Sequence, residues 1–192
     1  MRNNSEHEGM AQRLSHYKEY YARLAGGRVI FLTEDITREV ATSFNAMLMH
    51  YDSESKENIS IYINTYGGVV EALFSMYDMM NIIKSPITTI CIGKAYSAGS
   101  VILAAGTKGN RLMTKNSNVM IHGVQTVFPL PDKDQKDMEK GFDNLKKVNT
   151  NVLTVLAKHT GKPLRLLQAD CKTDKYLDAK AALKYGIVDE II

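Results

Sequence analysis

Ser97 is the residue in this chain whose type and position could supply a nucleophile. It lies in the segment 93–100 (GKAYSAGS), directly after an apolar run and directly before a small, apolar stretch typical of a buried helix. A serine on a tight turn between a strand and a helix is lifted out of the sheet, as in a nucleophile elbow. The match to G-x-S-x-G is partial, because Ala95 stands at the first glycine. The alternative role for an isolated serine before a helix is that of an N-cap.

His122 could act as the base that a serine nucleophile needs. It directly follows the predicted strand 119–121, and none of the other four histidines directly follows a predicted strand. A parallel sheet presents its site residues at the carboxyl ends of its strands, so the pattern predicts His122 on the same edge as Ser97. A buried histidine with satisfied hydrogen bonds is the structural alternative.

Gly67 and Gly68 could offer backbone N–H groups to an oxyanion. They follow the predicted strand 59–64 and precede a predicted helix. Because glycines carry no side chain, an oxyanion can approach their N–H groups closely. A simple tight turn would also explain the pair.

Short strands and helix-sized spacers alternate along the chain. Alternating or β-branched runs predict strands at 29–32, 59–64, 87–92 and 119–121. Apolar stripes and small apolar stretches predict helices at 40–48, 70–80, 98–105 and 178–185. Such spacing predicts right-handed βαβ crossovers and a largely parallel, buried sheet. The expected fold class is therefore α/β.

The longest predicted helix covers residues 132–158. Its apolar residues recur every three or four positions, and the sequence Gly-Lys-Pro at 161–163 stops it. At 1.5 Å per residue such a helix is about 40 Å long, which exceeds one side of a domain of this size. Part of it is therefore expected to project from the domain or to pack on another subunit.

The composition predicts an ordinary globular protein with one domain. The 192 residues are 44% hydrophobic and 23% charged, with a net charge of +3, which disfavours a disordered chain and a dedicated nucleic-acid-binding protein. Residues 1–25 read as a polar N-terminal arm, and residues 26–192 as the domain. Cys91 and Cys171 lie 80 residues apart without metal-ligand spacing. Since no secretory signal or membrane-spanning run is visible, we expect a cytoplasmic protein with no membrane or nucleic-acid partner.

Seven ordered segments carry a resemblance to a known family. They are 62–68 (YINTYGG), 92–99 (IGKAYSAG), 103–111 (LAAGTKGNR), 116–117 (NS), 120–122 (MIH), 157–161 (AKHTG) and 185–189 (YGIVD). Together they resemble the ClpP family, the proteolytic subunits of Clp proteases, from about Tyr21 to the C-terminus. The resemblance implies a ClpP/crotonase-like α/β fold of repeated βαβ units, with a protruding handle helix in the region of about 124–160.

The resemblance also implies roles for individual residues. Ser97 matches the family's nucleophile, His122 its general base, and Asp170 the aspartate that orients the base. Asp174 follows four residues later and is the local competitor for that last role. The matching oxyanion-hole donors are two backbone N–H groups, those of Gly68 and Ala98.

The implied activity is that of a self-compartmentalised serine endopeptidase that takes part in protein quality control. It would hydrolyse unfolded polypeptides by acyl transfer, without a metal or cofactor, inside two stacked heptameric rings that are either homo-oligomeric or mixed. A hexameric Clp AAA+ ATPase would use the ATP and deliver the substrate, and Tyr62 matches one position of the surface on which that partner docks.

Several positions depart from the family pattern and keep other interpretations open. The residues concerned are Tyr66 before the glycine pair, Ala98 after the serine, Gly123 and Val124 after the histidine, and Ala169 before the aspartate. These departures suggest a divergent paralogue. The alternative function is therefore a latent or non-catalytic ring subunit of a mixed complex. A crotonase-like acyl-CoA enzyme is a third possibility, but it would not explain Ser97, His122 and Asp170 together.

Overall fold

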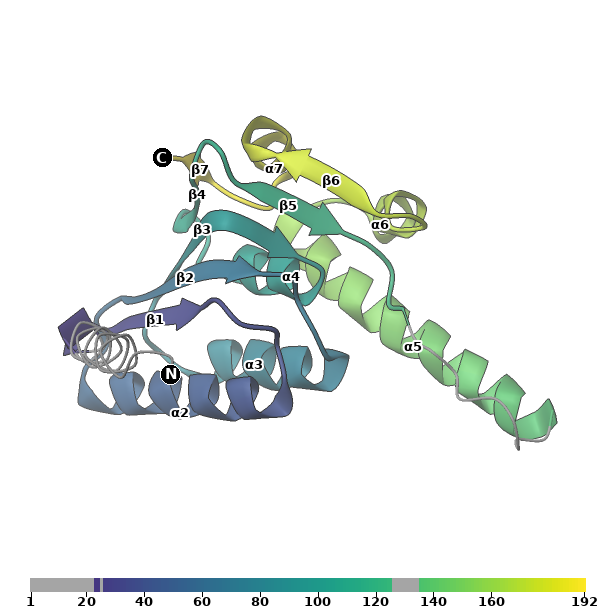
Figure 1. Ribbon diagram of the computed structural model, residues 1–192, viewed down its shortest axis with the longest axis horizontal. Helices are drawn as coiled ribbons and strands as arrows, with labels where there is room; N and C mark the ends of the chain where they lie inside the picture. Colours follow the sequence, from purple (N-terminus) through teal and green to yellow (C-terminus); the bar gives the residue numbers. More distant parts are fainter. Residues whose placement is uncertain (1–22, 25, 126–134) are drawn as a thin grey trace, which may run out of the picture.

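In the part of the chain that the structure describes, seven strands form a single sheet (Figure 1). The computed structural model describes residues 23–24, 26–125 and 135–192. The strands are β1 (Val29–Leu32), β2 (Ile59–Thr65), β3 (Ile87–Tyr96), β4 (Arg111–Met113), β5 (Asn118–Ile121), β6 (Lys175–Asp178) and β7 (Glu190–Ile191). The helices are α2 (Arg38–Glu54), α3 (Val70–Ile82), α4 (Ala98–Ala104), α5 (Gln135–Thr160), α6 (Leu164–Asp170) and α7 (Ala179–Tyr185).

The long strand β3 lies at the centre of the sheet and has two partners on one side. Its first half pairs with β4, and its second half pairs with β5. The strand order β1-β2-β3-β4-β7 is parallel throughout, whereas β5 pairs with β6 in the antiparallel sense. The α/β class and the largely parallel sheet are therefore confirmed. The predicted strands appear with small shifts of their ends, of which the longest is the extension of 87–92 to Tyr96.

Helices α2 and α3 lie side by side along one face of the sheet (Figure 1). Strand β2 alternates strictly between buried and half-buried residues, as a strand with one covered face should. Ile61 and Ile63 join Phe44 and Leu48 of α2 in the hydrophobic core. Tyr62 has the opposite parity, and its ring stacks on that of Phe31 at a centroid distance of 5.4 Å. Tyr62 therefore belongs to the face of the sheet that these helices leave open.

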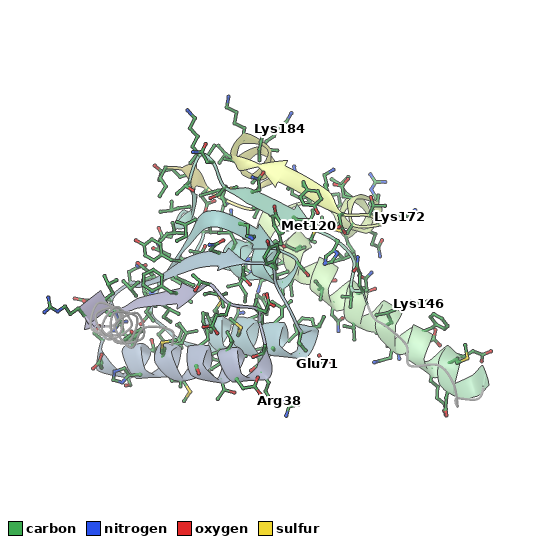
Figure 2. The ribbon with its side chains drawn as sticks, in the orientation of Figure 1. Arg38, Glu71, Met120, Lys146, Lys172 and Lys184 are labelled. Carbon is green, nitrogen blue, oxygen red and sulfur yellow. The ribbon has the colours of Figure 1, made fainter. Side chains whose placement is uncertain are left out.

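Helix α5 projects far beyond the rest of the domain (Figure 1). Its C-terminal part packs on the core through Val152, Leu153 and Leu156, which are all buried. Farther out, the Lys146 side chain points away from the body of the molecule (Figure 2). The predicted projection is thus confirmed. The predicted start at residue 132 and the proposed N-terminal arm fall almost wholly outside the described residues.

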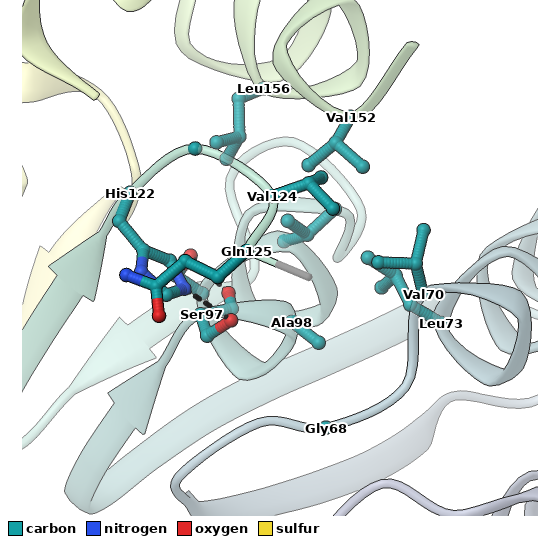
Figure 3. A pocket seen from close by; sticks show the side chains of 13 residues that line it. Gly68, Val70, Leu73, Ser97, Ala98, His122, Val124, Gln125, Val152 and Leu156 are labelled. Atoms are coloured by element: carbon teal, nitrogen blue, oxygen red, sulfur yellow. Dashed lines mark hydrogen bonds between the residues drawn. The ribbon is translucent and has the colours of Figure 1, made fainter. Parts of the chain in front are cut away.

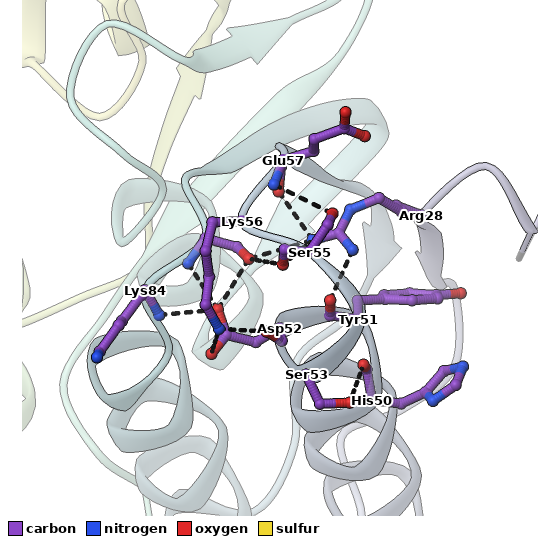
Figure 4. Close-up of polar contacts among 10 residues, drawn as sticks. Arg28, His50, Tyr51, Asp52, Ser53, Ser55, Lys56, Glu57 and Lys84 are labelled. Atoms are coloured by element: carbon purple, nitrogen blue, oxygen red, sulfur yellow. Dashed lines mark hydrogen bonds and ion pairs between the residues drawn. The ribbon is translucent and has the colours of Figure 1, made fainter.

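The C-terminal end of α2 is tied to the loop before β3 through Asp52 (Figure 4). Its Oδ1 accepts hydrogen bonds from the backbone N–H groups of Lys84 and Ser85, at 3.0 and 2.8 Å. Its Oδ2 pairs with the Lys56 Nζ at 2.7 Å. The bond from Lys56 and those from Ser85 and Lys84 hold the pKa of the Asp52 carboxyl well below its usual range, although partial desolvation opposes them. The Asp52 carboxylate therefore fixes the loop between α3 and β3.

A buried ion pair joins β4 to the chain's C-terminal segment. Arg111 is 1% exposed, and its Nε and Nη2 donate to the two oxygens of Asp189 at 2.7 and 2.6 Å. Its Nη1 also donates to the His159 carbonyl at the end of α5, at 2.9 Å. Burial alone would raise the pKa of Asp189, but hydrogen bonds from Arg111 and Lys108 outweigh it and keep the pKa far below its usual range. The guanidinium thus has a charged partner in a place where water does not reach.

We predict that Asp189→Asn lowers the free energy of unfolding by about 3 kcal/mol, because it leaves the buried Arg111 charge uncompensated. Lys108→Ala is the matched control. This change removes the Lys108 ammonium, the other cation that pairs with Asp189. Because the Lys108 side chain is 77% exposed, its loss should lower the free energy of unfolding by less than about 1 kcal/mol. Urea denaturation at pH 7 measures both variants. Equal losses would contradict the central role given to Arg111.

Candidate active site

Ser97 occupies a strained turn between β3 and α4. Its backbone adopts φ 52° and ψ −122°, and it is one of two non-glycine residues with a positive φ in the described chain. Such backbone strain is typical of functional positions, where the surrounding structure enforces it. The Ser97 N–H donates to the Met120 carbonyl at 2.9 Å, which anchors the turn to β5. Although Ser97 precedes α4, its side chain makes no capping bond, so the N-cap interpretation does not explain it.

The Ser97 hydroxyl is bonded to His122 (Figure 3). His122 Nε2 lies 2.7 Å from Ser97 Oγ, and the imidazole side chain is 16% exposed. The parallel pairing of β3 with β5 matches Tyr96 to Met120, so the two strands deliver the serine and the histidine to one edge of the sheet. The structure therefore brings together the two residues that the sequence placed there.

The structure does not bring Asp170, the expected orienting aspartate, to His122. Asp170 lies at the end of α6, where its Oδ1 pairs with Lys175 Nζ at 2.9 Å and its Oδ2 accepts from the Tyr185 hydroxyl at 2.8 Å. His122 Nδ1 instead lies 3.2 Å from Asp174 Oδ1. The physical reason is the loop between α6 and β6, which carries Asp174 to the imidazole and leaves Asp170 beside β6 and α7.

Gly67 and Gly68 run close to the turn that carries Ser97. A Cβ on Gly67 would lie 2.8 Å from the Ser97 Cβ and 2.9 Å from the Ala98 nitrogen. Gly68 forms a parallel bridge with Ile36 in which Ile36 donates to the Gly67 carbonyl and Val69 donates to the Ile36 carbonyl. This bridge does not use the Gly68 N–H. The Ala98 N–H begins α4, where helical N–H groups have no acceptor within the helix.

A pocket of about 220 Å³ opens beside Ser97 and His122. Gly68 and Ala98 line it together with the catalytic candidates, and one side is strongly apolar (Figure 3). This apolar wall is built from α3, α4, the segment after β5, and α5. Its side chains are Val70, Leu73, Val101, Val124, Val152 and Leu156. The sequence does not mark these residues as a group, because those in the helices belong to ordinary apolar stripes. Such a wall suits an apolar side chain of a bound molecule.

Other reactive groups give no competing centre in the described part of the chain. Cys91 and Cys171 are free and buried, and burial raises the pKa of each thiol to about 11. Both are therefore protonated near neutral pH and poor nucleophiles. Within residues 23–24, 26–125 and 135–192, no group of three or more potential metal-ligating side chains of His, Cys, Asp or Glu comes together. Among the helices described, none is both long and apolar enough to cross a membrane.

Comparison with known families agrees with this fold. The sequence model of the Clp protease family matches residues 12–192, which is nearly the whole chain. The protein therefore belongs to the Clp protease family. Its class is that of a ClpP-type peptidase, with the mostly parallel α/β architecture described above.

We predict that Gly68→Ala lowers the rate of reaction at Ser97 by about 100-fold or more, because it displaces a backbone N–H beside the nucleophile. Gly68 has φ +156°, and a Cβ there would lie 2.3 Å from the Ile36 carbonyl oxygen. The rate of labelling by a fluorophosphonate measures the effect. Gly26→Ala is the control, because a Cβ at Gly26 meets nothing within 4 Å. An unchanged labelling rate in a folded Gly68→Ala protein would contradict the prediction.

Proposed function

We propose that this chain is a serine endopeptidase subunit that cleaves unfolded polypeptides by acyl transfer. The observation that carries the proposal is the 2.7 Å bond between Ser97 Oγ and His122 Nε2, at a strained turn that opens into a pocket. An N-cap serine or a merely buried histidine needs neither this contact nor the strain. Membership in the Clp protease family supports peptide bonds as the target.

In the proposed reaction Ser97 Oγ attacks the carbonyl carbon of a peptide bond while His122 Nε2 takes the hydroxyl proton. The carbonyl oxygen becomes an oxyanion, and the N–H groups of Gly68 and Ala98 are the proposed donors to it. His122 then gives its proton to the leaving amine, and an acyl-enzyme remains on Ser97. Water, activated by His122, releases the acid and restores the serine. These reaction steps use only groups of the chain and water, without a cofactor.

The apolar wall of the pocket supports binding of an extended peptide beside Ser97. Val152 and Leu156 come from the buried part of α5 and face the same space as Leu73. Burial of one apolar side chain there would contribute about 1.5–3 kcal/mol and would position the carbonyl before attack.

We further propose that the subunit works in stacked heptameric rings, homo-oligomeric or mixed, and that a hexameric Clp AAA+ ATPase delivers the substrate. The part of α5 that projects beyond the other described elements supports contacts between subunits (Figure 1). Tyr62 and Phe31, stacked on the open face of the sheet, are the proposed part of the ATPase-docking surface. The two free thiols fit a reducing compartment such as the cytoplasm.

We predict that a fluorophosphonate modifies the wild-type protein at Ser97 and blocks hydrolysis of a short fluorogenic peptide. Ser97→Ala should lose both reactions, because no other group replaces the nucleophile. Ser43→Ala is the matched control, since it removes a hydroxyl from an exposed position on α2. Mass spectrometry of peptides locates the modification. Absence of modification and of hydrolysis in the assembled wild-type protein would reject the enzymatic proposal in favour of a latent ring subunit.

We also predict a native mass many times the 21.5 kDa of one chain, because the outer part of α5 needs neighbours to cover it. Native mass spectrometry of the purified protein checks this prediction. A stable monomer that cleaves the fluorogenic peptide would contradict the proposed assembly and leave the proposed chemistry intact.

A further inference from the structure

Two aspartates compete for His122, and they occupy different environments. Asp170 ends α6, and Asp174 immediately precedes β6. Only Asp174 is bonded to the imidazole, with Oδ1 3.2 Å from His122 Nδ1. Its side chain is 42% exposed, so solvent reaches the carboxylate but does not separate it from the ring.

The register of the sheet explains why Asp174 is the residue at this position. Strands β5 and β6 pair in the antiparallel sense, with Ile121 opposite Lys175. One residue beyond this pair, forward from Ile121 and backward from Lys175, His122 lies opposite Asp174. A strand pair fixes its register through every ladder bond, so the contact follows from the backbone rather than from a flexible side chain.

Gly123 allows the loop before β6 to close on the segment after His122. Its N–H donates to the Cys171 carbonyl at 2.8 Å. A Cβ at this position would lie 3.1 Å from that carbonyl oxygen and 3.1 Å from Asn149 Oδ1. Asn149 Oδ1 in turn accepts from the Val124 N–H at 2.8 Å. A larger residue at position 123 would press on both contacts, so the glycine found here fits the close approach of the 171–174 loop.

Asp170 is held by other partners on both of its oxygens. The bond from Lys175 is the main reason that the pKa of the Asp170 carboxyl lies below its usual value, with the Tyr185 hydroxyl adding to the effect against some desolvation. The Tyr185 ring also lies 5.7 Å from Lys162 Nζ and 5.8 Å from Lys175 Nζ, within cation–π range. Asp170 thus joins α6 to β6 and α7, which is a structural task.

We infer that Asp174, and not Asp170, is the positioning residue for His122 in this protein. The inference rests on the proposed peptidase function and assigns its third polar group. The Asp174 carboxylate accepts the Nδ1–H of the imidazole, which leaves Nε2 free to accept the Ser97 proton. It also stabilises the positive charge that the ring acquires when that proton arrives.

Asparagine at position 174 would reverse this tautomer preference. An amide can turn its NH₂ group toward Nδ1, which favours the proton on Nε2 and removes the acceptor that Ser97 needs. Loss of the corresponding carboxylate in serine proteases costs about 10⁴-fold in kcat. Because Asp174 is partly exposed, we expect Asp174→Asn to lower kcat by about 10²- to 10⁴-fold with little change in KM.

The decisive experiment compares Asp174→Asn, Asp174→Glu, Asp170→Asn and Tyr185→Phe in the full chain. Peptide hydrolysis and fluorophosphonate labelling at Ser97 should fall strongly for Asp174→Asn and recover in part for Asp174→Glu. Asp170→Asn and Tyr185→Phe should stay within about tenfold of the wild type. Strong loss in Asp170→Asn with normal rates in Asp174→Asn would overturn the inference. Equal loss in both would also overturn it, provided that both proteins are folded by circular dichroism.

A second measurement does not depend on activity. In the wild type, ¹⁵N NMR of histidine-labelled protein should find the neutral His122 ring protonated at Nδ1. Asp174→Asn should move that proton to Nε2, and Tyr185→Phe should not. If Asp170→Asn does not fold, this result decides the question. If the wild type is neither labelled nor active, the proposed function fails, while an Nδ1–H that responds only to Asp174 still supports the positioning contact.

Discussion

The pairing of β3 with β5 is the constraint on which the site depends. It sets Tyr96 beside Met120, and the bond from the Ser97 N–H to the Met120 carbonyl carries the pairing one residue past the end of β3. That bond holds Ser97 at φ 52°, a conformation that costs about 1–3 kcal/mol and that a free turn would relax. Because His122 follows β5 directly, the same pairing also places the imidazole. Ser97 and His122, the proposed nucleophile and base, thus lie at the same end of one parallel strand pair.

β6, the strand beside β5 at the candidate site, runs antiparallel to β5. Its direction decides which residue lies beside His122. β5 and β6 form the only antiparallel strand pair in the described residues, and β6 brings its N-terminal end to the C-terminal end of β5. A parallel strand would bring its C-terminal end there instead. The residue beside His122 is therefore taken from the start of β6, and the polar segment between α6 and β6 becomes part of the site.

Sequence could predict the parts of the molecule whose signals are local. The sequence predicted the strongly patterned strands and the serine and histidine that follow two of them. It also predicted the long helix α5. β4, β6 and β7, with three, four and two residues, were not predicted, and they pair with the edges of β3, β5 and β4. The choice between Asp170 and Asp174 depends on antiparallel register, which leaves no mark in the residues themselves. The resemblance to the ClpP family favoured Asp170, and the contacts favour Asp174.

Helix α5 links the site to the outside of the domain. Its inner part supplies Val152 and Leu156 to the pocket wall, and Asn149 holds the segment after His122 through the Val124 N–H. Its outer part extends away from the sheet (Figure 1). The inner part of α5 therefore contributes both to the pocket wall and to the position of the segment after His122, the two structures that the proposed chemistry requires to be in place.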